Sequence, residues 1–271
     1  MNKILFYICF HLIFIGSTFA QEIKSPILVK KITGSFVYFK PDELGNVYAL
    51  TSTGQLKKYN TNLDSMGVFN DVRNYGTLHY IASGNALRTI LFFKQYRTIL
   101  LLDRLMQIVN KIDLRKSQLF QVQAITQSYD NNIWIFDEQE SKLKKLNESG
   151  KLIFESADLR LVFSEAIQPS QIFDAGGFVY LYDAAKGLYI FDYYGAFKSK
   201  VTLLGWRNLQ LVGNNITGIK DEKIMSYKLN SLDISESNLP VLLKNAKQLY
   251  FSASGCTALE EDGIYSYQWS K

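Results

Sequence analysis

The strongest constraint on the fold of this chain is a pattern that recurs about every forty residues. Each repeat holds one apolar run and, eight to ten residues later, the start of a second one. The first run is anchored successively at Val47, Ile90, Ile133, Val179, Ile216 and Cys256. The second run is anchored at Leu56, Ile99, Leu143, Leu188, Ile224 and Ile264. Because the two sets of anchors stay in phase through six units, one supersecondary unit is repeated along the chain.

Residues 131–155 show what one unit contains. The run Ile133–Phe136 is apolar at every position, which is typical of a strand buried on both faces. The segment Leu143–Leu146 alternates less cleanly, and its Lys144 and Lys145 are predicted to face outward. The Asn147–Gly150 turn leads into a third apolar run. Consecutive strands joined by short turns form an antiparallel meander.

Each unit also has a candidate strand before and after the two anchored runs. The preceding strands are predicted at residues 36–39, 78–82, 122–126, 170–174, 209–212 and 248–251. The following strands are predicted at residues 67–69, 107–112, 152–156, 196–201 and 232–235. Six such units, repeated at the spacing typical of propeller blades, predict an all-β fold, a six-bladed β-propeller.

The sixth unit has no strand after its second run, because the chain stops at Lys271. An unassigned apolar run lies at the other end, in residues 25–33. We therefore predict that this N-terminal segment is the outer strand of the last blade and closes the ring. Closure would remove exposed inner edges, which are a liability for any β-sheet.

Two segments fit the repeat less well. Leu102, Leu105, Met106, Val109 and Ile112 fall at helical spacing, so residues 101–114 could form a helix instead. The strand interpretation requires a turn near Asp103-Arg104 and is preferred because it keeps the register of the repeat. Residues 157–168 form a long connection that could include a helical turn.

The N-terminus has the pattern of a signal peptide over residues 1–20. Lys3 precedes an apolar run from Ile4 to Ile15, and Thr18-Phe19-Ala20 supplies a cleavage motif. This run is too short to span a bilayer, which needs about 20 apolar residues. The chain is therefore predicted to be exported, to the periplasm, the cell surface or the medium, with no membrane span after cleavage. Residues 21–271 lack a linker-like segment and are predicted to form a single β-propeller domain.

Charge and cysteine content exclude some functions. The formal net charge is +5, but the lysines are spread along the chain in pairs, a pattern that does not favour nucleic-acid binding. Cys256 is the only cysteine outside the predicted signal peptide, so no disulfide within the mature chain is expected. Its apolar surroundings favour a buried, unreactive thiol.

The repeat resembles the NHL-type and related six-bladed propellers. The resemblance rests on Gly45-Asn46-Val47-Tyr48, Asn131-Asn132-Ile133-Trp134 and Gly187–Asp192, and it covers Phe36 to the C-terminus. It implies an architecture and not an activity. The second, fifth and sixth units depart from the motif; Arg88-Thr89, for example, replaces the Gly-Asn pair.

Catalytic signatures are missing. The sequence has no phosphate-binding glycine loop, HExxH or CxxC motif, and no catalytic residue is assigned. His79 is the only histidine outside the signal peptide, and its strand pattern favours a structural or channel-lining role. Some exported six-bladed propellers resemble calcium-dependent hydrolases, which leaves an alternative with calcium as cofactor. Its candidate ligands, all at strand ends beside turns, are Asn46, Asp130, Asp174 and Asn214.

The sequence therefore favours a binding module over an enzyme. Trp206 and Arg207 follow a glycine and are predicted to form an exposed contact, because Trp and Arg lead interface hot spots. Tyr193, Tyr194 and His79 complete the predicted binding set. The predicted partner is a protein or glycan of the cell envelope, and the predicted state is a monomer without a cofactor. A calcium-dependent hydrolase or lyase acting at the central channel is the alternative.

Overall fold

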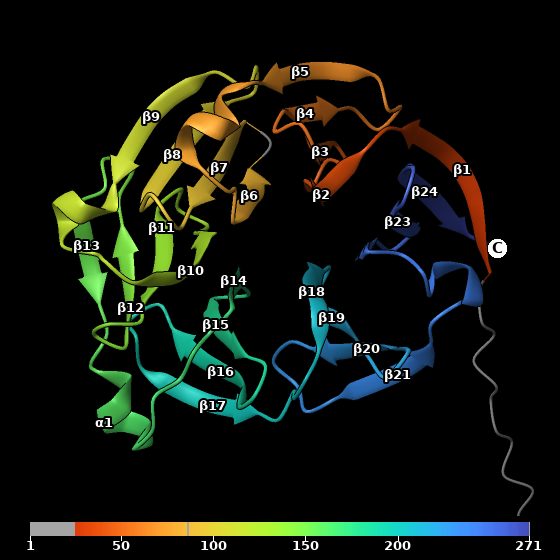
Figure 1. The fold of residues 1–271 in the computed structure, drawn as a ribbon. Coiled ribbons are helices and arrows are strands. Elements are labelled where there is room, and N and C mark those ends of the chain that lie inside the picture. The colour runs from red at the N-terminus through yellow and green to blue at the C-terminus, as the bar shows by residue number, and fades with distance from the viewer. Residues whose placement is uncertain (1–24, 86, 271) are drawn as a thin grey trace, which may run out of the picture.

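The computed structural model describes residues 25–85 and 87–270. The predicted signal peptide, residues 1–20, lies outside the described residues. The chain is an all-β six-bladed propeller in which six four-stranded antiparallel sheets stand around a common axis (Figure 1). In the described part of the chain, no helix is both long and apolar enough to cross a membrane.

The first three blades follow one another along the chain, each from its inner to its outer strand. The first comprises β2 (Phe36–Pro41), β3 (Val47–Thr51), β4 (Leu56–Tyr59) and β5 (Ser65–Phe69). The second comprises β6 (Tyr80–Asn85), β7 (Arg88–Phe93), β8 (Thr98–Asp103) and β9 (Ile108–Asp113). The third comprises β10 (Val122–Gln127), β11 (Ile133–Asp137), β12 (Lys142–Leu146) and β13 (Leu152–Glu155).

The remaining blades continue in the same order. The fourth comprises β14 (Gln171–Ala175), β15 (Phe178–Asp183), β16 (Gly187–Asp192) and β17 (Phe197–Val201). The fifth comprises β18 (Arg207–Val212), β19 (Asn215–Lys220), β20 (Lys223–Lys228) and β21 (Ile234–Asn238). The sixth combines β22 (Gln248–Phe251), β23 (Gly255–Glu260) and β24 (Gly263–Trp269) with β1 (Pro26–Thr33) from the N-terminus.

The predicted ring closure is confirmed. β1 pairs with β24 in antiparallel register from Pro26–Trp269 to Thr33–Gly263, with one irregularity between Leu28 and Lys30. Two glutamines join neighbouring inner strands. The side chain of Gln248 exchanges hydrogen bonds with the backbone of Phe39, and Gln210 accepts from the backbone N–H of Phe251. The ring is therefore closed by β1 in the sixth blade, and hydrogen bonds of the two glutamines connect inner strands of neighbouring blades.

The helical alternative for residues 101–114 is wrong. β8 and β9 occupy this segment and pair with each other, because the side chains of Leu100 to Leu102 fill the space between sheets. Met106 adopts a left-handed backbone at the turn, with φ 65°. The connection at residues 157–168 does hold a short helix, α1 (Leu159–Phe163). The other short helices are η1 (Asp71–Tyr75), η2 (Leu114–Ser117) and η3 (Val241–Leu243).

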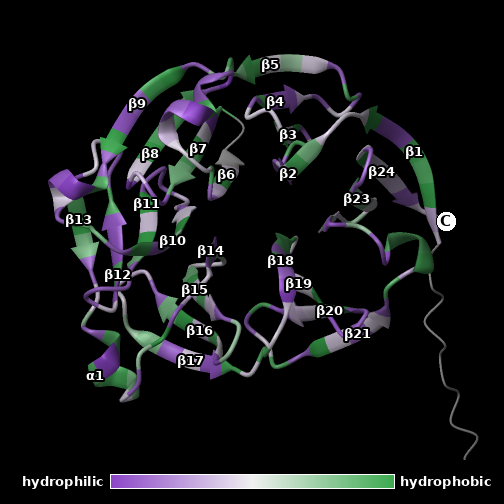
Figure 2. Ribbon diagram, in the orientation of Figure 1, coloured by the Kyte–Doolittle hydropathy of each residue, from purple (hydrophilic) through white to green (hydrophobic). Residues whose placement is uncertain are grey.

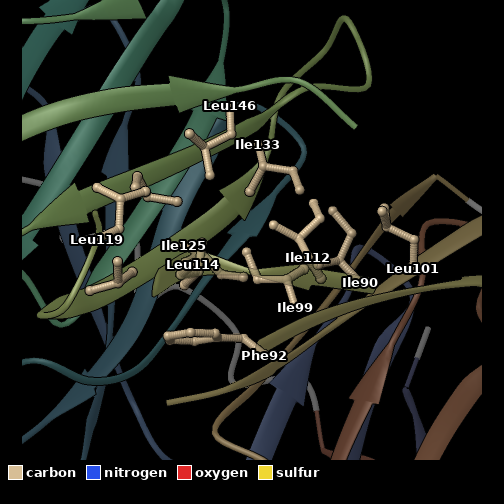
Figure 3. Close-up of a cluster of buried hydrophobic side chains, with 13 residues drawn as sticks. Ile90, Phe92, Ile99, Leu101, Ile112, Leu114, Leu119, Ile125, Ile133 and Leu146 are labelled. Carbon is tan, nitrogen blue, oxygen red and sulfur yellow. The ribbon is translucent and has the colours of Figure 1, made fainter. Parts of the chain in front are cut away.

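The hydrophobic core lies between neighbouring blades. Figure 3 shows one such interface, where side chains of the second blade meet those of the third, among them Ile90, Phe92, Ile99, Leu101, Ile125, Ile133 and Leu146. The middle strands contact a neighbouring sheet on both faces, which explains their continuous apolar runs. Outer strands such as β9 and β17 mix hydrophilic and hydrophobic residues because one side faces solvent (Figure 2).

Cys256 is buried as predicted, at 3 % exposure, and packs with Leu249, Ala258 and Tyr267. Burial raises the pKa of its thiol to about 12. We expect negligible thiolate at neutral pH, and therefore labelling of the native protein by a thiol reagent at the rate of unfolding. Labelling of the native and urea-unfolded protein, followed by mass spectrometry, measures this. Rapid native labelling would contradict the prediction.

Candidate functional site

A cavity of ≈ 1090 Å³ lies at one mouth of the central channel. Every inner strand contributes residues to it, among them Lys40, Ala82, Thr126, Phe173, Leu211 and Tyr250. The six inner strands therefore run in the same direction and end around one opening. The turns that follow them form the rim, and the turns between the third and fourth strands of each blade reach the same face.

The cavity wall combines aromatic rings with small polar groups. The aromatic residues are Tyr80, Tyr129, Phe173, Tyr250, Phe251 and Tyr267. The hydroxyl and amide residues include Thr61, Ser83, Thr126, Gln127, Ser252, Ser254, Thr257 and Gln268. Such a mixture offers flat apolar faces and hydrogen-bonding groups to a ligand.

A lysine and three tyrosines meet in this channel from three different blades. The Lys40 ammonium lies 4.8 Å from the ring centre of Tyr250 and 5.7 Å from that of Tyr80. Burial and repulsion from Glu43 raise the pKa of Tyr250 to about 12. Burial, followed by the neighbouring Tyr80 and Tyr250, raises the pKa of Tyr38 well above its usual range. The phenols of Tyr38 and Tyr250 therefore stay protonated at neutral pH.

Asp174, at the end of β14, is the centre of a second cluster on the rim. Its carboxylate accepts hydrogen bonds from Ser128 Oγ at 2.8 Å, Trp134 Nε1 at 2.9 Å and Tyr193 Oη at 2.5 Å. The backbone N–H of Tyr129 also donates to it, at 3.3 Å. The donors come from the third and fourth blades, so Asp174 joins these two blades at the rim.

Lys145 is enclosed by aromatic rings beside this cluster. Its ammonium lies 4.7 Å from the ring centre of Trp134, 5.2 Å from that of Tyr129 and 5.7 Å from that of Tyr193. It also donates to Asp130 Oδ2 at 2.7 Å. Burial acts to raise the pKa of Asp130, but hydrogen bonds from Lys145, Asn132 and Ser128 outweigh it and lower the pKa to about 2.

The prediction that Lys144 and Lys145 face outward is wrong. Their exposures are 4 % and 7 %. Lys144 and Lys145 are consecutive residues of an internal strand and point to opposite faces of the sheet, and both faces are covered, so each buried charge requires a partner. Lys144 pairs with Asp137 at 2.7 Å, as Lys145 does with Asp130.

The four candidate calcium ligands lie at or beside turns of four different blades, and two of them, Asp174 and Asp130, already accept hydrogen bonds from the donors named above. The amide nitrogen of Asn46 donates to Asp42 Oδ2 at 2.8 Å, which fixes the side chain within its own turn. Asn214 is an exposed residue of the β18–β19 turn in the fifth blade. Among the described residues, no group of three or more His, Cys, Asp or Glu side chains could hold a metal ion.

A repeated turn explains why Asn and Asp occupy strand ends. In four blades, an Asn or Asp at the end of the third strand accepts from the backbone N–H groups two and four residues later; these are Asn60, Asp103, Asn147 and Asp192. A residue of the same turn then has a left-handed backbone, with φ between 63° and 82° at Leu63, Met106, Gly150 and Gly195. These polar residues close turns, as short Asx side chains commonly do.

The predicted binding residues are not brought together. Tyr193 and Tyr194 lie on the β16–β17 turn, on the cavity face; Tyr194 is 89 % exposed, whereas Tyr193 is half-buried and stacks on Tyr129. Arg207 begins β18 and His79 precedes β6, so both lie toward the opposite end of the channel. Desolvation and the charge of Lys94 lower the pKa of His79, which does not line the cavity.

The expectation that Trp206 forms an exposed contact is wrong. Its exposure is 5 %, and its ring packs with Tyr182, Leu188 and Leu203 in the core between the fourth and fifth blades. The backbone carbonyl of Trp206 accepts a hydrogen bond from Tyr182 Oη at 2.9 Å. The preceding Gly205, with φ 71°, turns the chain so that Trp206 is buried and Arg207 is exposed.

The sequence did not predict that Lys40 meets Tyr38, Tyr80 and Tyr250 in the channel, or that aromatic rings enclose Lys145. The one local indication of the channel site is that Lys40 is a charged residue in an otherwise apolar inner strand. Tyr38 and Lys40 share one side of β2 because strand side chains alternate. Nothing in the local sequence indicates that Tyr80 and Tyr250 approach them.

The fold is shared with known proteins of low sequence identity. No protein-family model matches the chain, and no curated protein matches it. The WD40 domain of Neurospora crassa Pan2 is similar with a TM-score of 0.66 and 10% identity, over 92% of this chain and 97% of that one. A catalytically inactive histidine-to-alanine variant of virginiamycin B lyase from Staphylococcus aureus, with quinupristin, is also similar. Its TM-score is 0.59 with 12% identity, over 91% of this chain and 99% of that one.

The extracellular domain of a hybrid two-component system protein from B. thetaiotaomicron is also similar. Its TM-score is 0.54 with 15% identity, over 86% of this chain and 33% of that chain. At such low identities, these likenesses establish the propeller fold alone.

Proposed function

We propose that this chain is an exported binding module that receives a protein or glycan of the cell envelope at its cavity face, without catalysing a reaction. One observation carries the proposal. The rim carboxylates Asp42, Asp130 and Asp174 are engaged by donors of the protein itself, which leaves Glu43 as a single carboxylate of the cavity lining without such a donor among the described residues. The cavity then offers aromatic, hydroxyl and cationic groups, which bind ligands, but no carboxylate pair arranged for acid–base chemistry among the residues described.

The export, the envelope partner and the monomeric state belong to this proposal. They are supported by the N-terminal sequence, by dispersed charge and by the likeness to an extracellular domain of the same fold. The absence of a cofactor and of nucleic-acid binding is part of the same proposal. Descent from NHL-type propellers is likewise a proposal, and it rests on the motifs around Val47, Ile133 and Leu188.

The alternative is a calcium-dependent hydrolase or lyase, and the fold likeness to virginiamycin B lyase is the observation that favours it. That lyase is described as inactive when one histidine is replaced by alanine. In the described part of this chain the single histidine is His79, which lies away from the cavity. The engaged oxygens of Asp130 and Asp174 further weaken this alternative.

Binding at the cavity face predicts the effect of one exposed tyrosine. We expect Tyr194→Ser to reduce capture of the partner from the envelope fraction at least about fivefold, because exposed aromatic anchors dominate interfaces. Quantitative pull-down with immobilised protein measures this. The melting temperature should hardly change, because Tyr194 is 89 % exposed.

The matched control is Tyr96→Ser, which removes a 55 % exposed tyrosine from the β7–β8 turn at the opposite face. Capture by this variant should equal that of the wild type. Loss of capture with Tyr96→Ser and not with Tyr194→Ser would show that the partner binds at the opposite end of the central channel. Metal-dependent turnover of an ester, lactone or glycan that is lost in Asp174→Asn would refute a purely binding role.

A further inference from the structure

Lys40 is the one lysine or arginine that lines the cavity among the described residues. Its ammonium has no ion-pair or hydrogen-bond partner in the described part of the chain, where it contacts the rings of Tyr80 and Tyr250. Lys142 and Lys144, by contrast, each contact carboxylates at 3.4 Å or less. Lys58 also lies over an aromatic ring, but it does not line the cavity. A cation that faces a cavity without a carboxylate partner retains its capacity to bind an anion.

The phenols around Lys40 add neutral donors. Within the described residues, the hydroxyls of Tyr80 and Tyr250 make no hydrogen bond to another side chain or to the backbone, and both residues line the cavity. A phenol hydroxyl donates one hydrogen bond and also accepts. These two tyrosines can therefore donate to a ligand that lies beside Lys40.

The cavity also holds an unsatisfied acceptor. The amide oxygen of Gln127 is buried and has no hydrogen-bond partner among the described residues, and Gln127 lines the cavity. Its amide nitrogen donates to Asn131 Oδ1 at 3.5 Å, which orients the group. The oxygen itself is shielded from solvent, so a ligand hydroxyl reaches it only when the Gln127 side chain turns toward the cavity; such a bond would satisfy it, because buried polar atoms without a partner are costly.

We propose that the channel mouth binds an acidic saccharide, with a sugar carboxylate on Lys40, the ring against Tyr250 or Tyr80, and ring hydroxyls on the amide and hydroxyl groups of the wall. The inference rests on the proposed binding function and names the ligand class of the same face. A cavity of ≈ 1090 Å³ is large enough for a short oligosaccharide. Glu43, whose charge reaches Tyr250, opposes an anion there and lowers the affinity.

The test is calorimetric titration of the purified protein with trigalacturonic acid and with its methyl ester, which keeps the rings and removes the charge. We expect the acid to bind at least about tenfold more tightly than the ester, since a hydrogen bond to a charged group contributes about that factor. Lys40→Met should abolish this preference, and Glu43→Gln should strengthen binding of the acid. Lys151→Met removes the same charge from an exposed turn and should change nothing.

Equal binding of acid and ester, or undiminished binding of the acid by a folded Lys40→Met variant, would overturn the inference. Inorganic phosphate is the third probe. If phosphate binds with the same dependence on Lys40 while the saccharide acid does not bind, the site is a simple anion site. The proposal of an acidic saccharide as the ligand is then wrong. If no probe binds but capture still depends on Tyr194, this inference fails and the proposed function stands. If capture fails as well, both fail.

Discussion

A protein that begins at Gly34 and so lacks β1 is expected to lose several kcal/mol of its free energy of unfolding. Single domains have only about 5–15 kcal/mol in total, so the loss is a large fraction of the stability. The truncation removes the whole β1–β24 ladder, leaves β24 as an open edge and breaks the ion pair between Lys31 and Asp262. Urea unfolding followed by circular dichroism measures the difference.

The control for this truncation keeps the strand and changes one exposed side chain. Val29 is 45 % exposed, so Val29→Thr should shift the free energy of unfolding by less than about 1 kcal/mol. A truncated protein that unfolds at the same urea concentration as the wild type would show that β1 does not close the ring in solution.

Replacement of Asp174 by alanine is expected to destabilise the protein by about 2–3 kcal/mol, because unpaired buried donors cost about 1–3 kcal/mol. The change leaves Trp134 Nε1, Ser128 Oγ and Tyr193 Oη without their acceptor. Asp233→Ala, which removes an exposed carboxylate of the fifth blade, is the matched control and should cost less than about 0.5 kcal/mol. Thermal unfolding of both variants measures the effect.

The same experiment separates the structural role of Asp174 from a calcium site. The melting temperature of the wild type should not depend on calcium or on a chelator, because the carboxylate is engaged by protein donors. A rise in melting temperature with calcium that is absent in Asp174→Ala would restore the calcium-dependent alternative.

The architecture was predictable because it is encoded locally. The apolar anchors of each unit mark middle strands, and the repeat spacing places them in six blades. The unassigned run at residues 25–33 and the missing last strand together predicted the closure that β1 and β24 make. Strand ends were predicted less well: the strand expected at residues 78–82 is observed as Tyr80–Asn85.

The candidate site was not predictable in the same way. Lys40, Tyr80 and Tyr250 lie on inner strands of the first, second and sixth blades, and only the closed ring brings them together. Local pattern determines whether a residue is in a strand, but burial depends on what packs against it. Trp206 is therefore in the core, and Lys145 is enclosed by aromatic rings from two blades. The sequence by itself determined the repeat, the strands and their order, whereas only the tertiary structure decided which side chains meet at the channel, because those contacts join residues far apart in the chain.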